Sequence, residues 1–133
     1  MMFFIALAIA AASPLTLNLS IRARGDRGHV YCAMWRGREG FPTRRDLSVA
    51  EGRGRVRDGS AIIRLAAEPG AGYAIACFHD ENENQRLDTG FLGIPTEGTG
   101  ASNDARPHFG PPKWSDAHFP VTATSTVPIL IHY

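Results

Sequence analysis

The chain has 133 residues, a formal net charge of +1, and only 20% charged residues. This length suits one domain and is too short for a (β/α)8 barrel, which needs about 250 residues, and the low charge argues against disorder. A chain of this size buries well over half of the surface that it exposes when unfolded, so we expect one packed core.

The charges are distributed unevenly along the chain. Residues 22–64 contain eleven arginines and five acidic residues, whereas residues 65–133 contain eight acidic and three basic residues. The first segment could present a basic face to an anionic partner, although arginines spread over solvated strand faces are the simpler interpretation. No nucleic-acid-binding motif accompanies them, so we do not expect nucleic acid as a partner.

The first twelve residues, MMFFIALAIAAA, are all apolar and end in small residues. They are typical of the hydrophobic region of a secretory signal peptide, with an A-x-A cleavage site at its end. The run is short and no basic residue precedes it, so a buried first strand is the alternative. No later segment approaches the roughly 20 apolar residues of a membrane span. We therefore predict a signal peptide over residues 1–12 and a periplasmic or secreted domain over residues 13–133.

Strand patterns begin directly after this segment. From Leu15 to Ala23, apolar residues alternate with polar ones, which is the pattern of a strand with one buried face. The turn residues 25–28 and the apolar run 29–35 (HVYCAMW) follow, so residues 15–35 are interpreted as a hairpin. Asp58-Gly59 is a second hairpin signal, between the strand-like residues 53–57 and 61–67.

Three further strands are predicted in the second half of the chain, over residues 73–79, 117–123 and 126–133. Pro128 in the last of them indicates an edge strand, because proline has no N–H group to donate to a ladder. About seven short strands and no convincing amphipathic helix predict an all-β fold, an antiparallel β-sandwich, with a small closed barrel as the alternative.

Cys32 and Cys77 lie in two of the predicted strands. In an exported sandwich they could form one disulfide between strands, whereas in a reducing compartment they would be core residues. The sequence does not decide between a bridged and an unbridged pair, because the orientation of the Cβ atoms is not encoded locally.

One long loop, residues 80–117, connects the third-last predicted strand to the last two. Asp80, Asn82, Asn84 and Asp88 occupy positions 1, 3, 5 and 9 of a calcium-loop pattern, and the carbonyl group of Arg86 falls at position 7. Calcium binds such loops because alternate residues of a tight turn direct oxygen atoms inward.

Two positions of the calcium-loop pattern differ from the usual residues. Gln85 stands at position 6, where glycine usually makes the sharp turn, and Phe91 replaces the bidentate glutamate at position 12. Glu97 is a candidate for the missing carboxylate. A loop held by its own side-chain-to-backbone hydrogen bonds is the alternative to a bound calcium ion.

The same region resembles a bacterial family of small exported proteins that contain a domain of unknown function. The matching motifs are Gly72-Tyr73, HDENEN at 79–84, LDT at 87–89, the residues GIPTEGTGASN at 93–103, and the segment 110–117. The resemblance implies an immunoglobulin-like or prealbumin-like sandwich and brings no established activity.

Two functions from different classes are consistent with these observations. The first is an exported, non-catalytic β-sandwich module, expected to be monomeric, that binds calcium in its loop and an envelope protein or a carbohydrate. The alternative is a hydrolase that uses His79, Asp80 and Glu97, since two carboxylates and a histidine suffice for general acid–base catalysis. Five aromatic residues are expected to pack on the loop, mainly as anchors in the core or the loop and secondarily as a platform for stacking sugars: Trp35, Phe41, Phe91, Phe109 and Trp114.

Overall fold

The structure is a computed structural model that describes residues 14–86, 97–106 and 110–133. The elements of this part of the chain are eight strands, two short 3-10 helices and one turn of α-helix: β1 (Leu15–Arg22), β2 (His29–Arg36), η1 (Arg45–Leu47), β3 (Ala50–Arg55), β4 (Ser60–Ala67), β5 (Gly70–Asp80), β6 (Thr99–Ala101), η3 (Ser102–Asp104), α1 (Trp114–Ala117), β7 (Phe119–Val121) and β8 (Ser125–Leu130).

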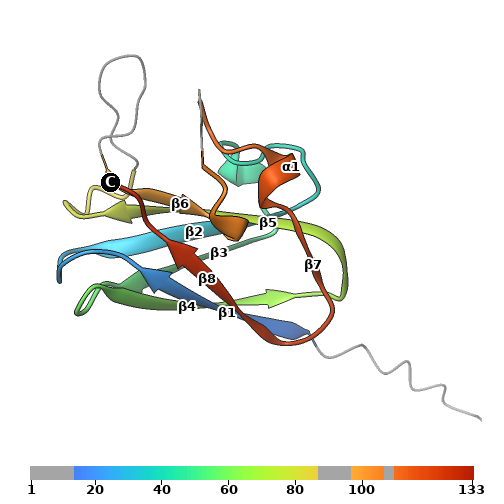
Figure 1. The fold of residues 1–133 in the computed structure, drawn as a ribbon, viewed down its shortest axis with the longest axis horizontal. Coiled ribbons are helices and arrows are strands. Elements are labelled where there is room, and N and C mark those ends of the chain that lie inside the picture. Colours follow the sequence, from blue (N-terminus) through green and yellow to red (C-terminus); the bar gives the residue numbers. More distant parts are fainter. Residues whose placement is uncertain (1–13, 87–96, 107–109) are drawn as a thin grey trace, which may run out of the picture.

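The strands form two sheets that pack face to face (Figure 1). One sheet has the order β4-β1-β8, and the other has the order β3-β2-β5-β6, with β7 paired to β5. All pairs are antiparallel except β1 with β8, which is parallel. The all-β sandwich expected from the sequence is confirmed, with eight strands in the described residues where about seven were expected.

The core lies between the sheets and follows from the alternation seen in the sequence. Leu17, Leu19 and Ile21 of β1 are at most 2% exposed, and the residues between them point to the outer face. Ile63 and Leu65 of β4 face the same core. Successive residues of a strand point to opposite faces, so these patterns place one side of each strand in the interior.

The first predicted hairpin is wrong, and of the second only the turn at Asp58-Gly59 is present, with two backbone hydrogen bonds between Arg57 and Ser60 across it. The chain turns after β1, but β2 belongs to the other sheet, and β3 and β4 are likewise in different sheets, joined only by a bridge between Arg57 and Ser60. A strand with one apolar face buries that face equally well beside its neighbour or across the core from it. The pattern within each strand therefore does not reveal the sheet to which it belongs.

The C-terminal strand β8 forms the edge of the three-stranded sheet, as Pro128 indicated. After Leu130 the chain leaves this sheet, and His132 pairs with Thr99 of the other sheet. Gly100 makes this close approach feasible, because a Cβ atom there would lie 2.5 Å from the carbonyl oxygen of Leu130.

The expected long loop, residues 80–117, contains β6, η3 and α1 in its described part. β6 extends the five-stranded sheet beside β5, and η3 and α1 cover one end of the outer face of that sheet (Figure 1). We call the described residues from η3 to α1 (102–106 and 110–117) the covering segment. Ala74, Ala101, Ala105 and Ala117 form a second small hydrophobic cluster beneath them.

Aromatic side chains anchor the covering segment rather than forming an open platform. Trp35 is only 1% exposed, and its ring contacts that of Phe41 edge to face. Phe41 contacts the ring of Trp114 in the same way. The other two aromatic residues considered for sugar stacking, Phe91 and Phe109, lie outside the described residues.

Cys32 and Cys77 form the disulfide that the sequence left open. They are directly opposite each other in the β2–β5 ladder, with Cα atoms 4.1 Å apart, and both are buried. A structural disulfide is typical of proteins that fold in an oxidising compartment. In the described part of the chain, no helix has the length and apolar character needed to cross a membrane.

Removal of the disulfide by the double substitution Cys32→Ala and Cys77→Ala should lower the free energy of unfolding by about 2–4 kcal/mol, because a cross-link restricts the unfolded chain. The measurement is urea unfolding of the wild type and the variant. Adding a reductant during unfolding should destabilise only the wild type. Equal denaturation midpoints for the two proteins would contradict a stabilising bridge.

Candidate functional site

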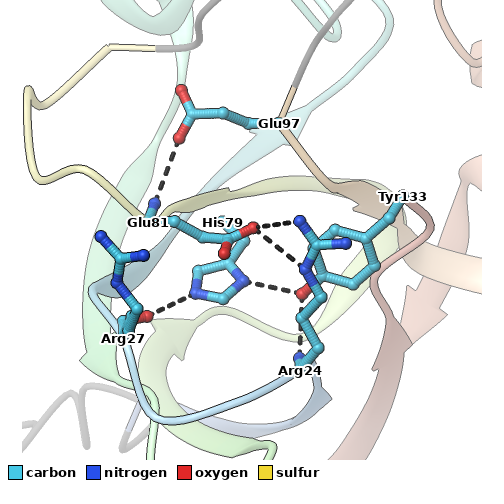
Figure 2. Close-up of polar contacts among 6 residues, drawn as sticks. All are labelled: Arg24, Arg27, His79, Glu81, Glu97 and Tyr133. Atoms are coloured by element: carbon cyan, nitrogen blue, oxygen red, sulfur yellow. Dashed lines mark hydrogen bonds and ion pairs between the residues drawn. The ribbon is translucent and has the colours of Figure 1, made fainter.

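His79 lies at the end of β5 and is fully buried. Its Nε2 atom is 2.6 Å from the carbonyl oxygen of Arg27, and its Nδ1 atom is 2.7 Å from the hydroxyl oxygen of Tyr133 (Figure 2). A carbonyl oxygen only accepts, so the proton is assigned to Nε2, and Nδ1 accepts from the Tyr133 hydroxyl. Both ring nitrogens are thus engaged by the protein.

Tyr133 connects His79 to the end of β1. Its hydroxyl oxygen accepts a hydrogen bond from the backbone N–H of Arg24 at 2.9 Å, and the Arg24 guanidinium lies 4.0 Å from the centre of the Tyr133 ring. The same guanidinium forms an ion pair with Glu81 at 2.8 Å. Burial raises the pKa of the Tyr133 hydroxyl. This cluster ties the first turn, the end of β5 and the C-terminal residues together (Figure 2).

Asp80 points to the opposite face of β5 and is also fully buried. Its two carboxylate oxygens accept hydrogen bonds from the backbone N–H groups of Asn84 at 3.2 Å and Gln85 at 2.7 Å. Gln85 has a φ of 65°, so it adopts the left-handed conformation that glycine favours at this position of a calcium loop. The Asp80 carboxylate therefore closes the turn formed by residues 80–86, which we call the Asp80 loop.

The side chains of Asn82 and Asn84 also accept hydrogen bonds within the Asp80 loop. The Oδ1 atom of Asn82 accepts from the N–H of Asn84 at 3.3 Å, and the Oδ1 atom of Asn84 accepts from the N–H of Arg86 at 3.1 Å. Glu97 contacts the start of the loop, where its carboxylate accepts from the N–H of Glu81 at 3.2 Å. The hydrogen-bonded turn that the sequence offered as the alternative to calcium is therefore present.

The structure thus brings together Asp80, Asn82 and Asn84, and places Glu97 beside the first residue after Asp80. Arg86 is exposed, and Asp88 lies outside the described residues. Over residues 14–86, 97–106 and 110–133, no group of three or more His, Cys, Asp or Glu side chains is arranged to hold a metal ion.

The donor chemistry nevertheless suits a hard cation. The Asp80 loop presents carboxylate and amide oxygens at alternate positions, which are the ligands that calcium prefers. Each such oxygen has a second lone pair besides the one that accepts the backbone hydrogen. Asp80, Asn82 and Asn84 would be the ligands from this part of the chain.

The signature residues near 98–103 have structural roles. Ser102 is fully buried, and its hydroxyl accepts from the N–H of Ile75 at 3.0 Å and donates to the carbonyl of Ala117 at 2.6 Å. A Cβ atom on Gly98 would lie 2.4 Å from the ring of Tyr133. This part of the motif fixes the covering segment and the C-terminal strand.

Sequence reasoning missed the partners of His79. Arg24, Arg27 and Tyr133 lie in no motif, and Tyr133 is 54 residues from His79 along the chain. The only local signal is that Tyr133 ends an apolar, strand-like run. Tyr133 reaches His79 because the neighbouring residue His132 pairs with Thr99 of β6, a long-range contact that local sequence patterns do not predict.

Asp104 and His132 form a second polar link between the covering segment and the C-terminal strand. The Nε2 atom of His132 lies 2.6 Å from a carboxylate oxygen of Asp104, and Arg106 lies 3.6 Å from the other oxygen. The hydrogen bond from His132, reinforced by its charge and that of Arg106, holds the pKa of Asp104 below its ordinary value.

A profile of the family described as "Uncharacterized protein conserved in bacteria (DUF2141)" matches residues 21–128. No match to a curated protein was found, and none to a solved structure.

Asp80→Asn should lower the free energy of unfolding by about 1–3 kcal/mol, because an amide has one acceptor oxygen where the carboxylate has two, so a buried hydrogen bond to the loop is lost and the NH2 group faces a loop N–H. Chemical denaturation measures this loss. Asp116→Asn, at an exposed carboxylate in α1, is the matched control and should change the stability by no more than about 0.5 kcal/mol. Equal effects of the two substitutions would contradict a special role for Asp80.

The pH dependence of stability tests the Asp104–His132 contact. The pKa of Asp104 is lower in the folded state, so its contribution is complete above the unfolded value of about 4 and is lost as the pH falls through the folded value. Asp104→Asn should therefore show a smaller fall in melting temperature than the wild type between about pH 5 and about pH 3. Asp116→Asn should retain the wild-type fall. An unchanged profile for Asp104→Asn would contradict this contribution.

Proposed function

The chain belongs to the bacterial family described as "Uncharacterized protein conserved in bacteria (DUF2141)". We propose a function for it from the chemistry of its own residues, because the description of the family names no activity. The protein is an exported, non-catalytic β-sandwich module that binds calcium at the Asp80 loop and binds a partner in the cell envelope. The observation that carries the calcium proposal is the conformation of the loop, in which oxygen side chains at alternate positions surround a turn with a left-handed residue at position 6.

Export is supported by two independent features. The apolar residues 1–12 have the pattern of a signal peptide, although they lie outside the described residues. The buried disulfide between Cys32 and Cys77 is typical of a compartment in which thiols are oxidised. A periplasmic or secreted location accounts for both.

A non-catalytic role is supported by the contacts of the three residues of the alternative hydrolase. A general base needs a free lone pair within reach of the substrate. His79 has one ring lone pair when neutral, and this lone pair receives the Tyr133 hydroxyl in a fully buried side chain. Without a free histidine the hydrolase alternative loses its base, and the contacts of Asp80 and Glu97 with loop N–H groups give these two carboxylates a role in the fold.

Calcium binding is supported by the charge of the Asp80 loop as well as by its oxygens. Asp80, Glu81, Glu83 and Asp88 place four acidic residues within nine positions of the sequence, with Arg86 among them. A divalent cation reduces the repulsion among such groups, which is the contribution that calcium would make here. We expect millimolar affinity, the regime of extracellular modules, because Phe91 supplies no oxygen at position 12.

Millimolar calcium should raise the melting temperature of the wild type by several degrees, because a ligand that binds only the folded state stabilises it. Scanning calorimetry with calcium, with magnesium and with a chelator measures the shift, and magnesium should give the smaller one. Asn82→Ala and Asp80→Asn should each abolish the calcium-dependent shift. The shift, rather than the absolute melting temperature, is the readout, since Asp80→Asn also destabilises the apo protein.

Asp116→Asn is again the control and should keep the full calcium shift. Identical melting curves with calcium and with chelator would show that hydrogen bonds alone hold the loop. The hydrolase alternative predicts a different result: Glu97→Gln would abolish turnover on a panel of hydrolase substrates and leave the melting temperature unchanged.

A further inference from the structure

β3 (Ala50–Arg55) forms an edge of the five-stranded sheet. It pairs with β2 and with no other strand in the described part of the chain. Its sequence, AEGRGR, alternates strictly: Glu51, Arg53 and Arg55 are exposed, and the residues between them are half-buried. A Cβ atom on Gly52 would lie 2.7 Å from Ile63, so the glycines allow β3 to lie close to the core.

The main chain of β3 has donors and acceptors that point away from the sheet. The N–H of Val56, just after β3, donates to the carbonyl oxygen of Gly28 at 3.0 Å. In an antiparallel ladder every second residue of a strand directs its N–H and C=O groups to the same neighbour, so Gly54 and Gly52 also face β2. The N–H and C=O groups of Arg53 and Arg55 therefore face outward. Within the described residues, no backbone hydrogen bond joins these outward groups to another strand.

The other sides of the sandwich offer less to an added strand. The edge strands β7 and β8 contain Pro120 and Pro128, which have no N–H group to donate. β4 contains no proline, but Arg64 is its only charged residue. β3 thus combines a continuous row of main-chain groups with two arginines.

The side chains of Arg53 and Arg55 are exposed, and Arg55 lines a pocket together with Glu81 and Glu83. Neither forms an ion pair with any residue that the structure describes, whereas Glu51 is paired with Arg45. Residues two positions apart in a strand are about 6.8 Å apart on the same face. An added strand presents its own alternate side chains at the same spacing, directly opposite them.

A second copy of the chain matches this edge less well than an acidic strand does. Two-fold pairing of β3 with itself around Arg53 sets Glu51 opposite Arg55 on both sides but leaves the two Arg53 guanidinium groups opposite each other, and pairing around Arg55 also sets Arg53 opposite Arg57. Basic residues on an edge strand are a common device against self-pairing. The same two arginines favour a strand with acidic side chains at alternate positions.

We propose that β3 binds an extended acidic segment of a partner protein by β-strand addition, with acidic side chains of the segment opposite Arg53 and Arg55. Main-chain hydrogen bonds supply the affinity, and the two ion pairs select the acidic sequence and its register. This site adjoins the Asp80 loop at Arg55 but contains none of its residues, and it does not require calcium.

The test uses the full chain with a chelator present, so that the result is independent of calcium binding. The probe is a capped octapeptide in which glutamate and valine alternate, and calorimetric titration measures its affinity. The same peptide with lysine in place of glutamate should not bind. Amide hydrogen exchange should slow at Arg53 and Arg55 when the acidic peptide is added, because their outward N–H groups become hydrogen-bonded.

Two substitutions at one position separate the main-chain contribution from the charge. Arg53→Gln keeps the outward N–H and removes the charge, and Arg53→Pro removes both without removing a donor to β2. Arg53→Gln should weaken binding by about tenfold, the effect of one charge-assisted contact, and Arg53→Pro should weaken it further. Arg64→Ala, at an exposed arginine of β4, is the control and should bind as the wild type does. The melting temperature of each variant confirms that it is folded.

Three results would overturn strand addition. The first is no binding at millimolar peptide. The second is equal binding by Arg53→Gln and Arg53→Pro together with unchanged amide exchange, which would indicate docking by charge alone. The third is binding of an acidic oligosaccharide, such as oligogalacturonate, with no binding of the peptide, which would assign the arginines to a carbohydrate.

Discussion

The two hydrogen bonds of the buried His79 side chain hold together three parts of the chain that are far apart in sequence. One bond fixes the turn after β1 through the carbonyl of Arg27, and the other fixes the last residue, Tyr133. An imidazole without partners in the core would lose its hydrogen bonds to water, so the chain must supply both contacts. Asp80 follows His79 as the last residue of β5, so the hydrogen bonds that hold His79 in place also fix where the Asp80 loop begins.

Several residues of the sequence motifs stabilise the fold. His79 joins the ends of the sandwich, Asp80 closes the turn that follows, and Ser102 fixes the covering segment to β5 and α1. Gly98 and Gly100 let the C-terminal strand lie directly against β6. Arg53 and Arg55, on which the proposed partner site depends, lie outside these motifs.

The two proposed sites lie at neighbouring corners of the molecule. Glu83 of the Asp80 loop forms an ion pair with His29 of β2, and His29 is the ladder partner of Arg55. A pocket of about 350 Å³ lies between them, and Arg55, Glu81 and Glu83 are among the residues that line it. The acidic side chains of the Asp80 loop and the basic side chain of Arg55 thus line the same pocket at the end of β3. Arg53 lies two residues further along the same strand.

The sequence by itself determined seven of the eight described strands, their buried faces and the presence of an edge strand at Pro128, because these depend on alternation and on the missing N–H of proline. It also singled out Asp80, Asn82 and Asn84 as one turn, since their spacing is local. It did not predict β6, a strand of three residues within the expected long loop. It did not determine which sheet each strand joins, and it left open whether Cys32 and Cys77 meet. Only the tertiary structure decided those questions and the pairing of His79 with Tyr133. They depend on contacts between distant segments, and either choice of sheet buries the same apolar face of a strand.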